Sequence, residues 1–204
     1  MKKLSKILLI DTATSHIFLS LVIDGKEKRS VYQEGINNHS VTIIPLLNEI
    51  LQTEGIELND LDEIIVGIGP GSYTGVRIGV TVAKMIGYLN HITVKTVSSL
   101  ALIASASDSE IVIPAIDARR GNAFISTFKQ NNRKLVCIKE DSLSVMEEYL
   151  KNAPEGYDLI SEGQPRPEKI IGSGLLHEVE NIHDLIPNYL RITEAERNKN
   201  GNNH

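Results

Sequence analysis

The amino-acid sequence predicts an α/β protein built from two lobes, the second smaller than the first. Three observations support this fold class: short apolar runs that alternate with amphipathic segments, a chain long enough for two cores, and a segment that occurs twice. The chain has 204 residues, of which 41% are apolar, and a chain of this size buries roughly 70% of the surface that its unfolded form exposes. Neither a metal ion nor a disulfide is therefore needed to hold the fold together.

The first half of the chain alternates between predicted strands and helices. Asp24 and Gly25 separate two strand-like runs and are typical of a two-residue hairpin turn, so the first three strands should pair antiparallel. Ser40 can cap the helix that follows, with Pro45 near its first turns. In order, we expect strands at 7–11, 18–23 and 30–33, a helix from 40 that ends before 55, a strand at 64–68, a helix at 74–89, a strand at 93–96 and a helix at 98–106.

A segment near the N-terminus recurs near the middle of the chain. Residues 10–20 (IDTATSHIFLS) align without a gap on residues 116–126 (IDARRGNAFIS), with four identities in eleven positions. Each copy follows an apolar strand and precedes a polar turn, as expected of a repeated supersecondary unit. We therefore expect a first lobe at residues 1–107, a smaller second lobe of related topology at 108–191, and a polar C-terminal tail at 192–204.

The composition excludes several classes of protein. Lys and Arg (21) are outnumbered by Asp and Glu (26), which argues against nucleic-acid binding by this chain alone. The one cysteine, Cys137, excludes a disulfide framework and a four-cysteine zinc site. No apolar stretch approaches the ~18 residues of a membrane span or the length of a signal peptide core, so we expect a cytoplasmic protein without membrane contact.

Asp11 and Asp117 end the two repeated strands and begin turns of small or polar residues, among them Thr12 and Ser15 in the first copy. The N–H groups and hydroxyls of such turns can hold phosphate, and the carboxylate can hold Mg²⁺ or its waters. Two facing turns could thus bracket a nucleotide. Alternatively, each aspartate bonds only to the backbone of its own turn. We predict that the two aspartates structure their turns more than they catalyse.

The segment from Gly67 to Gly79 (GIGPGSYTGVRIG) is the richest in glycine. It lacks the spacing of a Walker A loop and of a dinucleotide-binding loop, and Pro70 spoils a nucleophile elbow at Ser72. A tight strand-to-helix turn remains, with Ser72 or Thr74 available as the helix cap.

In the helix after this turn, small residues recur every four positions and form one stripe, at Gly75, Gly79, Ala83 and Gly87. Glycine costs up to ~1 kcal/mol in a helix interior, so another backbone should pack closely against the stripe. That backbone could belong to the same lobe or to a partner.

The histidines and hydroxyl residues indicate no catalytic or metal centre. None of the six histidines forms an i, i+4 pair, the spacing of a helical metal site, and no Ser, His and acid cluster can be deduced. We therefore predict no catalytic residue, no metal ligand and no cofactor.

The two Asp-led hairpins, the order of strands and helices, and IIGSG at residues 170–174 resemble the actin, Hsp70 and sugar-kinase superfamily, whose two lobes are RNase H-like. The resemblance implies that Gly172 and Gly174 form a degenerate adenosine-contacting turn. More specifically, DTATS near the N-terminus, GPGSYTGVRIG at 69–79, DARR at 117–120 and PNYLRITEAE at 187–196 resemble the TsaB family of Gcp-like proteins.

This resemblance implies a non-catalytic subunit of the bacterial complex that makes threonylcarbamoyladenosine next to the anticodon of tRNA. It implies a homodimer when the protein is alone, a heterodimer with a TsaD-like catalytic paralogue, a TsaE-like ATPase in the same complex, and tRNA contact only through the complex. The first-lobe helices would carry both associations, through interface residues that we predict to be Ile44, Leu47, Leu51, Gly75, Val76, Gly79, Val80 and Ala83.

The resemblance also bears on metal chemistry. The TsaD paralogue holds a metal through two histidines four residues apart, and Ser99 and Ile103 occupy the matching places here. An isoleucine cannot bind a metal, which weakens the hypothesis of a metallopeptidase.

One alternative function remains. A small-molecule kinase or ATPase could use Asp11 and Asp117 around Mg-ATP, although no motif supplies a third carboxylate or a lysine for phosphoryl transfer.

The chain between Gly174 and Pro187 is shorter than the helix that usually completes the second lobe. We therefore expect this lobe to be incomplete.

Overall fold

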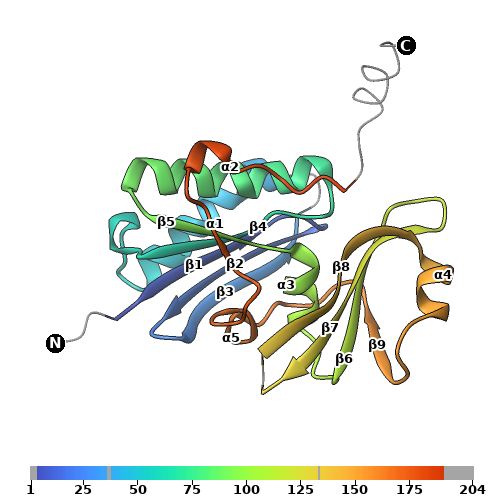
Figure 1. The fold of residues 1–204 in the computed structure, drawn as a ribbon. Helices are drawn as coiled ribbons and strands as arrows, with labels where there is room; N and C mark the ends of the chain where they lie inside the picture. Colours follow the sequence, from blue (N-terminus) through green and yellow to red (C-terminus); the bar gives the residue numbers. More distant parts are fainter. Residues whose placement is uncertain (1–3, 36–37, 133, 191–204) are drawn as a thin grey trace, which may run out of the picture.

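Two β-sheets, one in each lobe, form the framework of the molecule (Figure 1). The computed structural model describes residues 4–35, 38–132 and 134–190. The first sheet has six strands in the order β10-β5-β4-β1-β2-β3, and the second has four in the order β8-β7-β6-β9. The predicted two-lobed α/β class is confirmed, while the tail predicted at 192–204 lies outside the described residues.

The first lobe follows the predicted order of strands and helices. Asp24 and Gly25 connect the second and third strands with φ values of 50° and 74°, as a primed hairpin turn requires. The elements are β1 (Lys6–Asp11), β2 (His16–Ile23), β3 (Lys26–Glu34), α1 (His39–Thr53), the short 3₁₀ helix η1 (Leu58–Asp60), β4 (Glu63–Gly67), α2 (Tyr73–Asn90), β5 (Thr93–Val97) and α3 (Ser99–Ser105).

The starts of the three helices show which predicted caps were right. Ser72 Oγ accepts a hydrogen bond from Gly75 N at the start of α2, as predicted. Ser98 caps α3 from outside, so that helix begins one residue later than expected. Asn38, rather than Ser40, precedes α1, and its side chain makes no capping bond. Pro45 lies within the helix.

The second lobe repeats the topology of the first. In both lobes three consecutive strands pair antiparallel and a later strand pairs parallel with the first of them. The repeated turns differ in register, since Asp11 pairs with Phe18 whereas Asp117 pairs with Ala123. The elements are β6 (Ile111–Asp117), β7 (Asn122–Asn131), β8 (Lys134–Val145), α4 (Met146–Lys151), β9 (Tyr157–Ile160) and α5 (Pro167–Ile170).

After α5 the chain returns to the first lobe. Strand β10 (His177–Glu178) pairs antiparallel with β5, and the 3₁₀ helix η2 (Ile182–Asp184) packs on α2. The sequence places residues up to 191 in the second lobe, whereas residues 177–190 lie along the first. The edge of β5 offers unpaired N–H and C=O groups, which β10 satisfies. We call residues 177–190 the C-terminal strap.

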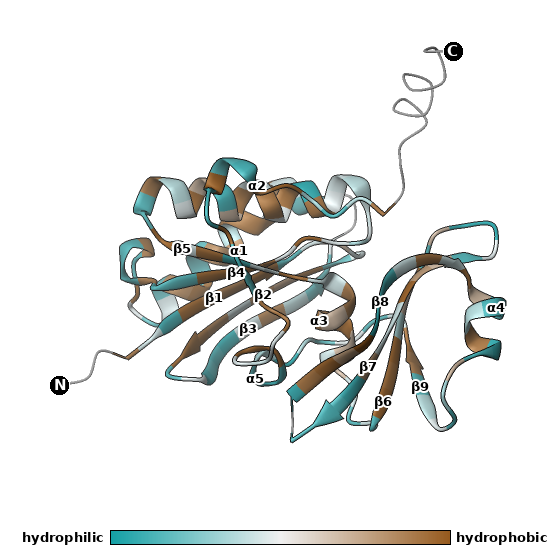
Figure 2. Cartoon of the chain, viewed as in Figure 1, coloured by the Kyte–Doolittle hydropathy of each residue, from teal (hydrophilic) through white to brown (hydrophobic). Residues whose placement is uncertain are grey.

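Three apolar clusters hold these elements together, and the brown strands of Figure 2 show how apolar the sheets are. One cluster lies between the first sheet and the helices α1 and α2. A second joins the other face of that sheet to α3 and to the second sheet, and therefore connects the lobes. The third lies under α4. None of the helices in the described part of the chain has the length and apolarity of a membrane span.

Candidate functional site

The two Asp-led turns lie at the end of the first strand in each lobe, but they present their side chains differently. A hollow of about 430 Å³ lies between them. Ser15 and Asp117 line it, together with Tyr73 and Thr74 of the first turn of α2 and Arg119 of the second Asp-led turn. Ser15 and Asp117, two of the residues expected at a nucleotide-like site, thus line the same hollow.

Asp11 is not one of the residues that line this hollow, and it is only 5% exposed. Its Oδ1 accepts hydrogen bonds from Ser99 Oγ at 2.9 Å and from Ala13 N at 3.2 Å. Burial raises the pKa of Asp11 to about 6, and the hydrogen bond from Ser99 opposes that rise. Asp11 therefore joins its own turn to the start of α3.

Thr12 is fully buried and connects the first turn to helix α2. Its hydroxyl donates to the carbonyl oxygen of Gly75 at 2.7 Å and accepts from the N–H of Gly79 at 2.9 Å. Because both hydrogen bonds lie inside the lobe, the Thr12 hydroxyl is not available to a ligand.

Asp117 is exposed, and its Oδ1 accepts a hydrogen bond from Arg119 N at 2.8 Å. Arg119, Arg120 and Gly121 then follow with φ values of 67°, 55° and 76°. Two consecutive arginines in the left-handed region are unusual, because only glycine and, less often, asparagine or aspartate adopt it readily. The DARR motif gives no sequence signal of this backbone conformation.

Gly172 and Gly174 lie outside the hollow, contrary to the predicted adenosine-contacting turn. Gly172 offers its carbonyl to Lys134 Nζ at 2.8 Å, and Gly174 lines a different cavity. The displacement follows from the course of the chain, which turns toward the first lobe directly after α5.

Most of the predicted interface residues are inside the first lobe. Ile44 is exposed (45%), but the other apolar side chains of the set are at most 4% exposed. A Cβ atom at Gly75 would lie 2.2 Å from the carbonyl oxygen of Thr12, and one at Gly79 would lie 2.6 Å from the Thr12 hydroxyl. The small-residue stripe thus packs against the lobe's own sheet: Gly75 and Gly79 approach the residue directly after β1, and Gly87 approaches Val94 of β5. The residues corrected in this way are Leu47, Leu51, Gly75, Val76, Gly79, Val80 and Ala83.

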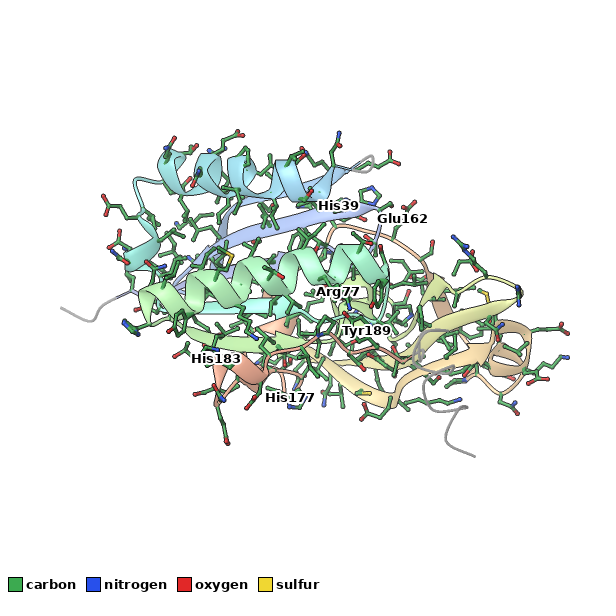
Figure 3. The ribbon with its side chains drawn as sticks, turned by 90° about the horizontal axis from the view of Figure 1, so that it is seen from above. His39, Arg77, Glu162, His177, His183 and Tyr189 are labelled. Atoms are coloured by element: carbon green, nitrogen blue, oxygen red, sulfur yellow. The ribbon has the colours of Figure 1, made fainter. Side chains whose placement is uncertain are left out.

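Four large apolar side chains of the same two helices are exposed. Helices α1 and α2 lie side by side over one face of the first sheet (Figures 1 and 3). The exposed fractions are 68% for Val41 and 45% for Ile44 on α1, and 56% for Met85 and 69% for Leu89 on α2. Val41 and Ile44 lie in the first two turns of α1, and Met85 and Leu89 lie in the last two turns of α2, which runs in the same direction. We call these four residues the apolar helix surface. Periodicity identified the helices but not which of their apolar residues would face outward.

The strap covers another flank of α2. Arg77 donates from Nε to the hydroxyl of Tyr189 at 2.6 Å and from Nη2 to that of Tyr73 at 2.5 Å, and Figure 3 shows Arg77 beside Tyr189. Further along, Lys84 Nζ donates to the carbonyl of His183 at 2.6 Å. This aromatic and cationic cluster had no signal in the sequence, since Arg77 and Tyr189 are 112 positions apart.

The sequence is similar to those of known protein families. The family model for TsaD, described as tRNA N6-adenosine threonylcarbamoyltransferase, matches residues 25–196. The tRNA threonylcarbamoyladenosine biosynthesis protein TsaB of Bacillus subtilis (strain 168) is 29% identical, and the alignment covers 93% of this chain and 96% of that protein. The TsaB of Haemophilus influenzae is 34% identical over 59% of this chain and 52% of that protein.

Solved structures show the same fold. The structure described as YeaZ from Pseudomonas aeruginosa has a TM-score of 0.77 at 22% identity, covering 91% of this chain and all of that one. A second structure, described as an uncharacterized protein with similarity to peptidase YEAZ from Pseudomonas aeruginosa, has the same TM-score at 23% identity over 92% of this chain. With a family model that spans most of the sequence and a TsaB that aligns over nearly the whole of both chains, this chain belongs to the TsaB family, within the wider group that the TsaD model describes.

Proposed function

We propose that this chain supports the formation of threonylcarbamoyladenosine in tRNA as a non-catalytic subunit that pairs with a TsaD-like paralogue. Its similarity to TsaB proteins named for this pathway supports the proposal. The observation that carries the proposed mode of action is the apolar helix surface, because large exposed apolar side chains on neighbouring helices are typical of docking sites.

The arrangement of α2 explains why this surface is free for a partner. One flank of the helix packs on its own sheet through the glycines, and a second flank is occupied by the strap through Arg77 and Lys84. Met85 and Leu89 continue the row of Ile78 and Val82, which are partly buried beside the first core cluster. A partner helix laid along this row would bury both residues.

A supporting role in place of catalysis fits the surroundings of Asp11. Ser99 and Ile103 stand where the TsaD resemblance implies two metal-binding histidines. In this structure Ser99 is fully buried and bonded to Asp11, and Ile103 is 4% exposed in the core cluster between the lobes. Among the described residues no group of three His, Cys, Asp or Glu side chains is placed to hold a metal ion.

The proposal also includes the other partners of the chain. The chain alone forms a homodimer through the apolar helix surface, and the TsaD-like paralogue competes for the same surface. A TsaE-like ATPase joins the resulting complex. The chain meets tRNA only as part of that complex, consistent with its net charge of −5.

The decisive experiment is co-expression of the chain with its TsaD-like paralogue. Replacing both Met85 and Leu89 by Asp should abolish co-purification and tRNA modification, and should leave a folded monomer by circular dichroism and size-exclusion chromatography. The matched control replaces both Val136 and Ile138 by Asp, which places the same two charges on similarly exposed apolar residues (47% and 51%) of the second lobe. A folded Met85 and Leu89 double variant that still co-purifies with the paralogue would refute the assignment of the surface.

A small-molecule kinase or ATPase is the second candidate, and the hollow lined by Ser15 and Asp117 is the observation that favours it. The position of Asp11 weighs against it, because its carboxylate bonds to Ser99 and the adjacent turn. Purified protein with Mg-ATP should therefore release no phosphate above the buffer background. Turnover that is lost in Asp117→Asn would support the kinase or ATPase instead.

A further inference from the structure

A second cavity, of about 280 Å³, lies at the junction of the two lobes and has no part in the proposed docking surface. Its walls come from the start of α3, from strands β7 and β8, and from the chain on either side of β10. The cavity is therefore separate from the hollow between the two Asp-led turns.

Two neighbouring carboxyl groups, those of Glu140 and Asp141, line one part of this cavity. Ser98 Oγ donates to Asp141 Oδ2 at 2.6 Å. In the described part of the chain no lysine or arginine forms an ion pair with either carboxylate. The ammonium of Lys139, next in sequence, instead lies 3.7 Å from the centre of the Tyr149 ring.

The electrostatic environment of the cavity is negative. Burial raises the pKa of Asp141. Burial also raises the pKa of the Cys137 thiol to about 11, and the charges of Glu140 and Asp141 contribute to that rise. Because a partly buried carboxylate without a counter-charge is unfavourable, an incoming cation would stabilise Asp141, and the exposed Glu140 lies beside it on the cavity wall.

The remaining walls combine apolar side chains, Phe128 and Leu175 among them, with the polar residues Thr96, His177 and Asn188. A volume of about 280 Å³ holds roughly ten non-hydrogen atoms at the ~30 Å³ that one water occupies in the liquid. Apolar walls beside convergent polar groups are the usual composition of a small-molecule site.

We propose that this cavity binds a small organic cation, a guanidinium or primary ammonium group on a short aliphatic stem. The carboxylates of Asp141 and Glu140 pair with the cationic head, which for a guanidinium allows two parallel hydrogen bonds. Phe128 and Leu175 contact the stem.

The test uses n-butylguanidinium and its neutral isostere n-butylurea, titrated into the full-length protein by isothermal titration calorimetry. The cation should bind with one site per chain, at least about 10-fold more tightly than the urea, since hydrogen bonds to charged groups are about twice as strong as neutral ones. Failure of the cation to bind, or equal affinity for the two probes, would overturn the proposal.

Variants locate the site. Asp141→Asn should weaken binding of the cation about 10-fold, whereas Glu178→Gln, an exposed carboxylate on the adjacent strand β10, should leave it unchanged. Gly174→Leu should also weaken binding, because the added side chain narrows the cavity while its Cβ meets no atom within 4 Å. Unchanged affinity in the Asp141 and Gly174 variants, with both folded by circular dichroism, would place any binding elsewhere and refute the assignment.

Discussion

Asp11 carries a carboxyl group whose surroundings favour the protonated form. Burial raises its pKa to about 6 in the folded protein, from the ordinary value of 3.8. Between these two pH values the folded state binds a proton that the unfolded state has lost. The contribution of Asp11 to stability is therefore fully present below pH 3.8 and is lost as the pH rises through about 6.

We predict that Asp11→Asn changes the pH dependence of stability. Asparagine keeps an oxygen that can accept hydrogen bonds from Ser99 and Ala13 but cannot ionise. The free energy of unfolding of the variant, relative to that of the wild type, should therefore rise by about 1 to 2 kcal/mol from pH 5 to pH 7.5. Urea unfolding at the two pH values measures the difference. Parallel wild-type and variant profiles would show that Asp11 does not titrate in this range.

Function should be insensitive to the same substitution. If Asp11 structures its turn, the variant supports tRNA modification in complex with the paralogue at a temperature where it is folded. A loss of modification by orders of magnitude, with folding and partner binding intact, would make Asp11 a catalytic residue.

At the scale of the element, α2 shows how one helix meets three surroundings. Gly75 and Gly79 contact the end of β1, and Gly87 contacts Val94 of β5. Arg77 and Lys84 form hydrogen bonds with the strap, and Met85 and Leu89 remain exposed. Close approach of α2 to the carbonyl of Thr12 is possible only because Gly75 has no side chain.

Gly75→Ala is predicted to destabilise the first lobe although alanine favours helices. The new Cβ would lie 2.2 Å from the Thr12 carbonyl oxygen, and such overpacking costs about 1 to 3 kcal/mol. Chemical denaturation measures the loss. Thr81→Ala, at an exposed position of the same helix, serves as the control and should be neutral or slightly stabilising. An equally stable Gly75→Ala protein would mean that α2 can move away from the sheet.

The sequence was sufficient to predict the elements but not their partners. Apolar periodicity located the three helices of the first lobe, and the recurrence of the Ile-Asp segment predicted the shared topology of the lobes, since both depend on local pattern. Whether the stripe of Gly75 and Gly79 faced its own sheet or a partner depends on how α2 is rotated about its axis. That rotation is set by contacts such as Thr12 with Gly75, 63 positions apart, which no local pattern encodes.

At the scale of the whole molecule, charged groups fasten the junction between the lobes. Asp108 follows α3 and receives hydrogen bonds from Arg166 Nη1 at 2.5 Å and from Lys169 Nζ at 3.0 Å, both near α5. These bonds, with that of Arg166 first in size, lower the pKa of Asp108 to about 2.

Asp108→Asn should therefore lower the melting temperature at neutral pH. The stabilising contribution of Asp108 is present above its unfolded pKa of 3.8 and is lost as the pH falls through about 2, so the two melting temperatures should converge over that acidic range. Differential scanning calorimetry from pH 2 to pH 7 follows the convergence. Asp24→Asn, an equal change of charge at an exposed hairpin turn, should show no such effect. A constant offset between wild type and Asp108→Asn at all pH values would contradict an electrostatic origin.

The return of the chain to β5 makes the second lobe an insertion within the first. The first lobe contains the earliest described strand as well as the last, β1 and β10, and the chain passes between the lobes twice, once before β6 and once after α5. A lobe tethered by one connection could swing and twist in any direction. Two connections form a double-stranded hinge that permits bending about the line joining them and resists twisting. Any relative motion of the lobes should therefore open or close the space between them without twisting one lobe against the other.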